Sequence, residues 1–174
     1  MTRSQENSNE GPGMTAIVCN TGPLIALAGI ERLDILRGLY ESVYLPQAVH
    51  EEILHGGRHF TGLDAYRKAD WITVSALQQP GDPLLATVLD VGEASVIQLA
   101  REIGVPRVLM DERKGRRVAR EVYGLDVMGT ARLLTDAKEA HLVANVGELL
   151  QQMRGAGYWI HSRIMEAAMR AAKE

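Results

Sequence analysis

Apolar residues form two kinds of pattern that alternate along the chain. Short runs rich in Val, Ile and Leu are typical of strands, whereas apolar residues three and four positions apart predict one face of a helix. The first pattern predicts strands at residues 16–19, 42–45, 71–77, 107–110 and 126–128. The second predicts helices at residues 23–39, 47–54, 65–68, 90–103, 112–123, 131–141, 146–154 and 162–173.

Strands that alternate with helices predict a parallel sheet, because right-handed crossovers place helices on both of its faces. We therefore expect a three-layer α/β/α sandwich around a central parallel sheet of about five strands. The length of 174 residues fits one domain, which we assign to residues 14–174. Residues 1–13 are polar with Gly and Pro, and we expect a disordered leader there.

Composition narrows the function classes. Hydrophobic residues make up 46%, enough for one core, and the net charge of -3 argues against a histone-like polycation. Cys19 is the only cysteine, and we expect it in the core. A single cysteine excludes a disulfide framework and fits a cytoplasmic location. No stretch approaches the roughly 18 apolar residues of a membrane span, so we expect no membrane contact.

Polar side chains follow two of the predicted strands directly. Asn20 and Thr21 come after the first strand, and Asp111 and Glu112 come after the fourth. In open α/β sheets the working site lies beyond the carboxyl ends of the strands. We therefore expect both pairs of residues at one edge of the sheet.

Two predicted helices carry further acids. With Val49 pointing to the core, helical spacing puts Glu52 beside the buried face and Glu51 on the solvent side, although the sequence leaves open which of them faces the site. Glu93 lies in the first turn of another helix. Carboxylates gathered in one pocket repel each other, and hard cations such as Mg²⁺ or Mn²⁺ relieve that repulsion and favour oxygen ligands.

Structural roles are the alternative for each of these residues. Asp90 and Glu93 have the spacing of a capping box. Asp111 and Glu112 would offset a helix dipole. Glu51 and Glu52 would be solvated charge, and Asn20 would shape a turn.

A basic segment follows Asp111. Cations at a helix start oppose the helix dipole, so their placement favours phosphate binding, with a solvated face paired to Glu112 and Glu121 as the alternative. The basic residues are Arg113, Lys114, Arg116, Arg117 and Arg120.

Three histidines raise the question of zinc. His50 and His55 are five residues apart, not the four that place two ligands on one helix face, and Gly56 and Gly57 separate them from His59. We therefore do not expect a zinc site.

The order of these motifs resembles the PIN-domain family of nucleases, in particular a prokaryotic, toxin-related subgroup. Residues 18–27 resemble its opening strand and turn, 45–53 its second acidic motif, and 92–94 its third. Residues 108–114 resemble its fourth acidic motif, and 127–130 are similar to its closing segment. The resemblance covers about residues 15–168, and the joint order of the motifs is what makes it specific.

The resemblance implies a Mg²⁺- or Mn²⁺-dependent endoribonuclease, a toxin with an antitoxin partner, and a homodimer. The implied catalytic metal ligands are Asn20, Glu52, Glu93 and Asp111, with Thr21 orienting the first and Glu112 as a further acid. RNA phosphates would contact Thr21, Arg113, Lys114, Arg116 and Arg117. The first ligand is normally Asp.

Asn20 leaves two other functions open. An amide oxygen brings no charge to a cation, so the alternative is a weak or inactive PIN-like protein that binds nucleic acid or regulates. A phosphoryl-accepting, dehalogenase-like protein is a third hypothesis, but it needs an Asp nucleophile where Asn20 stands.

Overall fold

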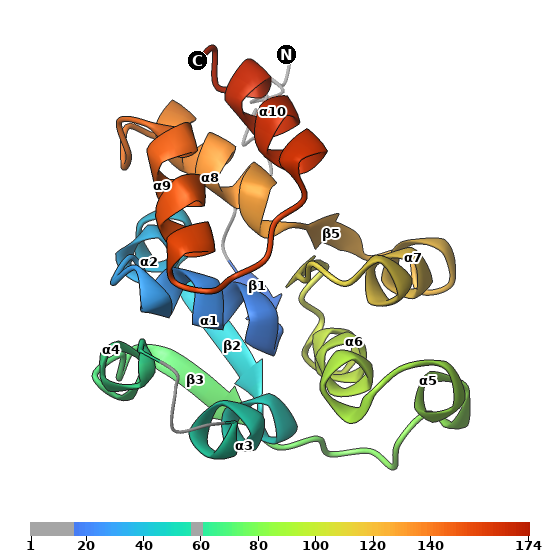
Figure 1. The fold of residues 1–174 in the computed structure, drawn as a ribbon. Coiled ribbons are helices and arrows are strands. Elements are labelled where there is room, and N and C mark those ends of the chain that lie inside the picture. The colour runs from blue at the N-terminus through green and yellow to red at the C-terminus, as the bar shows by residue number, and fades with distance from the viewer. Residues whose placement is uncertain (1–15, 57–60) are drawn as a thin grey trace, which may run out of the picture.

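The computed structural model describes residues 16–56 and 61–174. Its centre is a sheet of five parallel strands in the order β3-β2-β1-β4-β5 (Figure 1). The strands are β1 (Ala16–Cys19), β2 (Ser42–Pro46), β3 (Ile72–Ser75), β4 (Arg107–Leu109) and β5 (Asp126–Met128). The expected sheet of about five parallel strands is confirmed.

Helices cover both faces of this sheet. On one side α1 (Thr21–Gly29), α2 (Asp34–Leu39), α8 (Thr130–Glu139), α9 (Val146–Gly155) and α10 (Ser162–Ala171) pack together (Figure 1). On the other, α6 (Val91–Ile103) packs across β1, β2 and β4, with α3 (Gln47–His55), α5 (Pro83–Val88) and α7 (Arg113–Glu121) against it. The helix α4 (Leu63–Arg67) packs against α1. This is the three-layer α/β/α arrangement that the sequence predicts.

The central strand β1 is apolar because it is buried on all sides. Ile17, Val18 and Cys19 are fully buried, as expected for a strand that has a neighbour on each side and a helix on each face. Burial raises the pKa of the Cys19 thiol, so this residue belongs to the core and is no nucleophile. None of the helices in the described part of the chain is both long and apolar enough to cross a membrane.

One predicted helix was wrong, and one helix was not predicted. The helix expected at residues 23–39 is two helices, because Glu31 adopts a left-handed conformation (φ 56°) that ends the first. The helix α5 was not predicted. It has six residues and a single buried side chain, Leu85, so no apolar stripe marks it. Its start did carry a signal, since Asp82 accepts a hydrogen bond from the Leu84 amide and Pro83 follows it. The strand expected at 71–77 is shorter, and the other ends differ by two residues at most.

We expect Gly104→Ala to lower the free energy of unfolding by about 1 kcal/mol, because Gly104 closes α6 at φ 68° and an alanine there is strained. Nothing lies within 4 Å of the added methyl group, so backbone conformation alone decides the effect. Urea unfolding measures it. The control is Gly81→Ala, which also meets open space but has no positive φ; equal stabilities of the two variants would contradict the prediction.

Candidate metal and nucleic-acid site

The predicted site residues lie at the edge of the sheet formed by the carboxyl ends of β1 and β4. These strands are parallel neighbours, with Cys19 opposite Leu109. The backbone amide of Asn20 donates to the Leu109 carbonyl at 2.9 Å. The chain passes from β1 to β2 on one side and returns to β4 on the other, so this edge is the switch point where α/β sheets bind ligands. Asn20 and Asp111 therefore leave neighbouring strand ends.

Three side-chain oxygens converge on Gly92 at the start of α6. A Cβ atom at Gly92 would stand 3.0 Å from Glu52 Oε2, 3.4 Å from Asp90 Oδ1 and 3.5 Å from Asn20 Oδ1. The oxygens come from α3, from the loop before α6 and from the end of β1, and the missing side chain leaves the space between them open. The structure thus brings Asn20 and Glu52 together and adds Asp90, which the sequence indicated only as a helix cap.

Thr21 fixes the direction of Glu52. Its hydroxyl donates to Glu52 Oε2 at 2.8 Å, joining α1 to α3. Glu51 instead accepts a hydrogen bond from Gln47 on the exposed side of α3. Glu52, and not Glu51, faces the site.

Asn20 is buried at 7% exposure and precedes the first residue of α1. Its side chain makes no capping hydrogen bond to that helix. The amide oxygen does not serve as a helix cap, and it lies 3.5 Å from the Cβ position of Gly92.

Glu93 has both a structural and a site position. The capping box is present: the Glu93 amide donates to Asp90 Oδ1 at 2.8 Å, and the Asp90 amide donates to Glu93 Oε2 at 3.4 Å. The other carboxyl oxygen lies against α7, where a Cβ at Gly115 would stand 2.7 Å from it. Burial raises the pKa of Glu93, and the negative charge of Asp90 raises it further.

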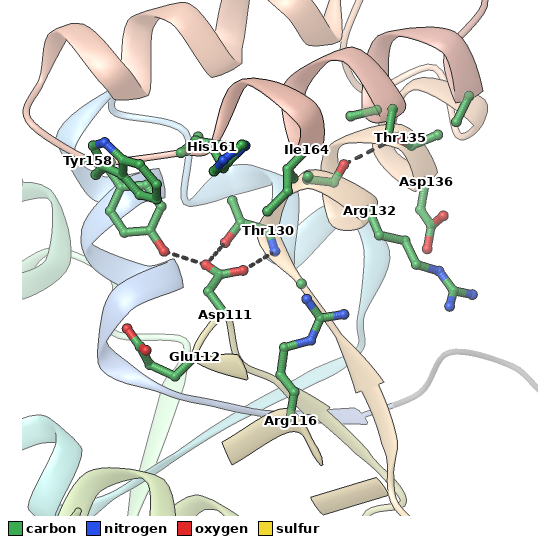
Figure 2. Close-up of a pocket in the computed structure, with 17 residues that line it drawn as sticks. Asp111, Glu112, Arg116, Thr130, Arg132, Thr135, Asp136, Tyr158, His161 and Ile164 are labelled. Atoms are coloured by element: carbon green, nitrogen blue, oxygen red, sulfur yellow. Dashed lines mark hydrogen bonds between the residues drawn. The ribbon is translucent and has the colours of Figure 1, made fainter. Parts of the chain in front are cut away.

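Asp111 is held by three donors at the end of β4 (Figure 2). Its Oδ1 accepts from the Thr130 amide at 2.8 Å, and its Oδ2 accepts from the Thr130 hydroxyl at 2.6 Å and from the Tyr158 hydroxyl. A carboxylate has about four lone-pair positions, so this leaves one free. Asp111 is therefore fixed by α8 and by the segment before α10, and it does not cap α7.

Tyr158 is a site residue that sequence reasoning missed. It lies between α9 and α10, after Gly157, whose φ of 94° turns the chain back over the sheet edge. Its hydroxyl also passes α1, 3.3 Å from where a Cβ of Gly22 would stand. Burial and the charge of Asp111 raise the pKa of the Tyr158 phenol, which therefore stays protonated as a donor. No local pattern marks this residue, whereas Thr130 is the first polar side chain after β5, separated from it only by Gly129, and the strand-end rule would have found it.

The basic residues of α7 divide into two groups. Arg113, Lys114, Arg117 and Arg120 are exposed, and Arg117 pairs with Glu121 at 3.0 Å. Arg116 is half-buried, and its Nη1 and Asp111 Oδ1 both lie 3.2 Å from the Cβ position of Gly129. Arg116 is thus the basic residue that accompanies Asp111.

A cavity of about 790 Å³ opens beside Asp111. Asp111, Glu112, Arg116 and Thr130 form its polar end, and the segment 158–161 with α10 forms its apolar wall (Figure 2). Its size is within the range of ligand-binding pockets. Of the implied metal ligands, Asp111 lines this cavity, whereas Asn20, Glu52 and Glu93 do not.

The donor set suits a hard divalent cation. Carboxylate and amide oxygens converge at Gly92, which are the ligands Mg²⁺ and Mn²⁺ prefer. In the described residues no three His, Cys, Asp or Glu side chains form a group that could hold an ion by themselves; Asn20 is outside that set, and Asp111 is turned to Thr130 and Tyr158. His50 and His55 are bound to Tyr66 and to the Glu51 carbonyl, and His59 lies outside the described residues.

Comparison with known proteins gives one match. A family model described as a PIN domain matches residues 16–174. No curated protein and no solved structure matches the chain. The match confirms the resemblance seen in the order of the sequence motifs.

We expect Tyr158→Phe to lower the free energy of unfolding by about 1–3 kcal/mol, because it removes a hydrogen bond to a charged carboxylate. Urea unfolding is the measurement. Tyr44→Phe is the matched control, since the Tyr44 hydroxyl has no hydrogen-bond partner among the described residues and its loss should change little. Equal effects of the two variants would show that the Asp111 contact contributes nothing to stability.

Proposed function

The chain belongs to the PIN-domain family, and we propose that it is a Mg²⁺- or Mn²⁺-dependent endoribonuclease. PIN domains are generally nucleases that use divalent metals. The observation that carries the proposal is the convergence of three oxygens from three segments within 3.5 Å of one point at the sheet edge.

Asn20 and Glu52, whose oxygens converge at Gly92, would hold the metal there, with Asp90 as a further acid. Glu93 and Asp111, which the resemblance also implies as ligands, are bonded to the Asp90 amide and to Thr130 and Tyr158, and would complete the set. A bound ion would polarise the phosphodiester and lower the pKa of a water molecule. The chain's own residues orient the ligands: Thr21 holds Glu52, and Thr130 with Tyr158 holds Asp111. Such outer contacts fix ligand geometry in metal sites generally.

Cations next to the carboxylates would receive the RNA backbone. Arg116 lies beside Asp111, and Arg113 and Lys114 lie exposed on the first turn of α7. Guanidinium groups bind phosphate oxygens through two parallel hydrogen bonds. Arg117, paired with Glu121, would contribute less than Arg116.

A second function rests on Asn20 alone. An amide in place of a carboxylate lowers the charge that attracts the cation, so the natural chain would bind RNA with little or no turnover. The toxin role, an antitoxin partner and the homodimer rest on the resemblance, a cytoplasmic location rests on the single cysteine, and together they complete the proposal.

We expect Glu52→Gln to slow cleavage of a labelled structured RNA in Mn²⁺ by about 100-fold or more, because it removes a charged ligand. Glu52 is exposed, so the variant should fold like the natural chain. The control, Glu51→Gln, neutralises the neighbouring acid on the other side of α3 and should cleave normally. Equal cleavage by Glu52→Gln and the natural chain would place the activity elsewhere.

We expect Asn20→Asp to bind Mn²⁺ about tenfold more tightly, because a third carboxylate would join Glu52 and Asp90. Electron paramagnetic resonance titration of free Mn²⁺ measures this without any turnover. Cleavage by Asn20→Asp but not by the natural chain would favour the second function. Unchanged Mn²⁺ affinity would show that residue 20 does not contact the ion.

A further inference from the structure

Residues 158–174, which we call the 158–174 strap, form one side of the cavity beside Asp111. The strap contains α10, which packs on α8 and α9 (Figure 1). Ile164 and Ala168 of this helix line the cavity, as does Tyr158 at the start of the strap. The strap therefore lies next to the acid that follows β4.

The middle of the strap is held only weakly. Within α10 only Met165 and Ala168 are buried, each at 7% exposure, whereas Leu150 and Met153 of α9 are fully buried. A helix of ten residues is marginal without tertiary contacts. Segments with few buried apolar contacts open locally at a lower free energy than the core does. We therefore expect α10 to open more readily than the sheet.

The start of the strap is fastened to the sheet edge and to α9. The Tyr158 hydroxyl donates to Asp111, and Arg154 of α9 donates to the Ile160 carbonyl at 2.9 Å. Gly157 precedes these contacts with a φ of 94°, and apart from its chain neighbours no described residue lies within 4 Å of its Cβ position. This glycine supplies a point where the chain can pivot.

The end of the strap is fastened by Glu174. Its carboxylate accepts from Lys138 Nζ at 2.6 Å, from the Val146 amide at 2.7 Å and from the Gly147 amide at 2.8 Å. Val146 and Gly147 are the first two residues of α9, and their amides have no partner within the helix. The Glu174 side chain is 11% exposed, and a carboxylate is stabilising at a helix N-terminus. One side chain thus binds the strap to both α8 and α9.

We propose that the 158–174 strap opens and closes as one unit, and that Glu174 holds it closed. Opening detaches Tyr158 from Asp111 and removes the apolar side of the cavity, so closure of the strap controls how Asp111 is held. The opening itself is independent of the proposed function, and only its consequence for catalysis rests on that function. Because two fastened ends hold a weak middle, loss of either fastening weakens the whole strap and not one turn of it.

Hydrogen exchange of individual amides, followed by NMR in EDTA without RNA, tests the proposal. In the natural chain the hydrogen-bonded amides of α10 should share one protection factor, at least about 100-fold below that of the β1 amides. Glu174→Gln removes the charge that Lys138 and α9 bind, and it should speed exchange throughout α10 by about tenfold. The control, Glu166→Gln, makes the same change at an exposed acid of α10 and should leave exchange unchanged.

Tyr158→Phe tests whether the two ends act together. It removes the fastening at Asp111 and should speed exchange of the Ala172 and Glu174 amides, at the opposite end of the strap, by about tenfold. These amides donate to the Ala168 and Met169 carbonyls, so their exchange reports on the closed strap. The control, Tyr44→Phe, removes a hydroxyl from β2 and should leave these amides unchanged.

Two outcomes would overturn the proposal. If the α10 amides exchange as slowly as those of β1, the strap opens only when the whole chain unfolds. If Glu174→Gln affects residues 172–174 alone and Tyr158→Phe leaves them unchanged, Glu174 is a local cap and the strap does not move as a unit. Neither measurement involves a metal or RNA, so failure of the nuclease proposal would appear in the cleavage assay alone.

Discussion

The pairing of β1 with β4 brings the two halves of this protein's site together. These strands are separated by most of the first hundred residues, yet Cys19 and Leu109 lie opposite each other. The backbone amide of Asn20 donates to the Leu109 carbonyl. Because the strands are parallel, both chains leave the sheet at the same edge. Every later feature of the site, from the oxygens at Gly92 to the cavity beside Asp111, depends on this register.

The acidic side chains at this sheet edge repel one another. Asp90 lies near Glu52 at Gly92 and shares the first turn of α6 with Glu93, and burial raises the pKa of Glu93. Hydrogen bonds from Thr21 and from the α6 backbone offset part of the repulsion. A divalent cation would offset the rest, which gives the proposed metal a role in stability as well as in chemistry.

The C-terminal helices contribute more than a covering layer. Tyr158 lies in the segment between α9 and α10, and its hydroxyl donates to Asp111. The last part of the chain therefore fixes the acid that follows β4. Trp159, from the same segment, also lines the cavity beside Asp111. One short stretch of chain thus both positions the acid and forms part of the cavity wall.

The sequence by itself determined the parallel sheet, most of its helices and the sheet edge where Asn20 and Asp111 emerge. Each of these follows from local signals: apolar periodicity, glycine at helix ends, and polar residues directly after strands. The break at Glu31 and the short helix α5 escaped prediction because no apolar stripe marks them. Only the tertiary structure decided that Glu52 faces the site, that Asp90 joins Asn20 there, and that Tyr158 binds Asp111. The physical reason is that these contacts join residues from separate elements, and their geometry depends on how whole helices pack and not on the residues nearby in sequence.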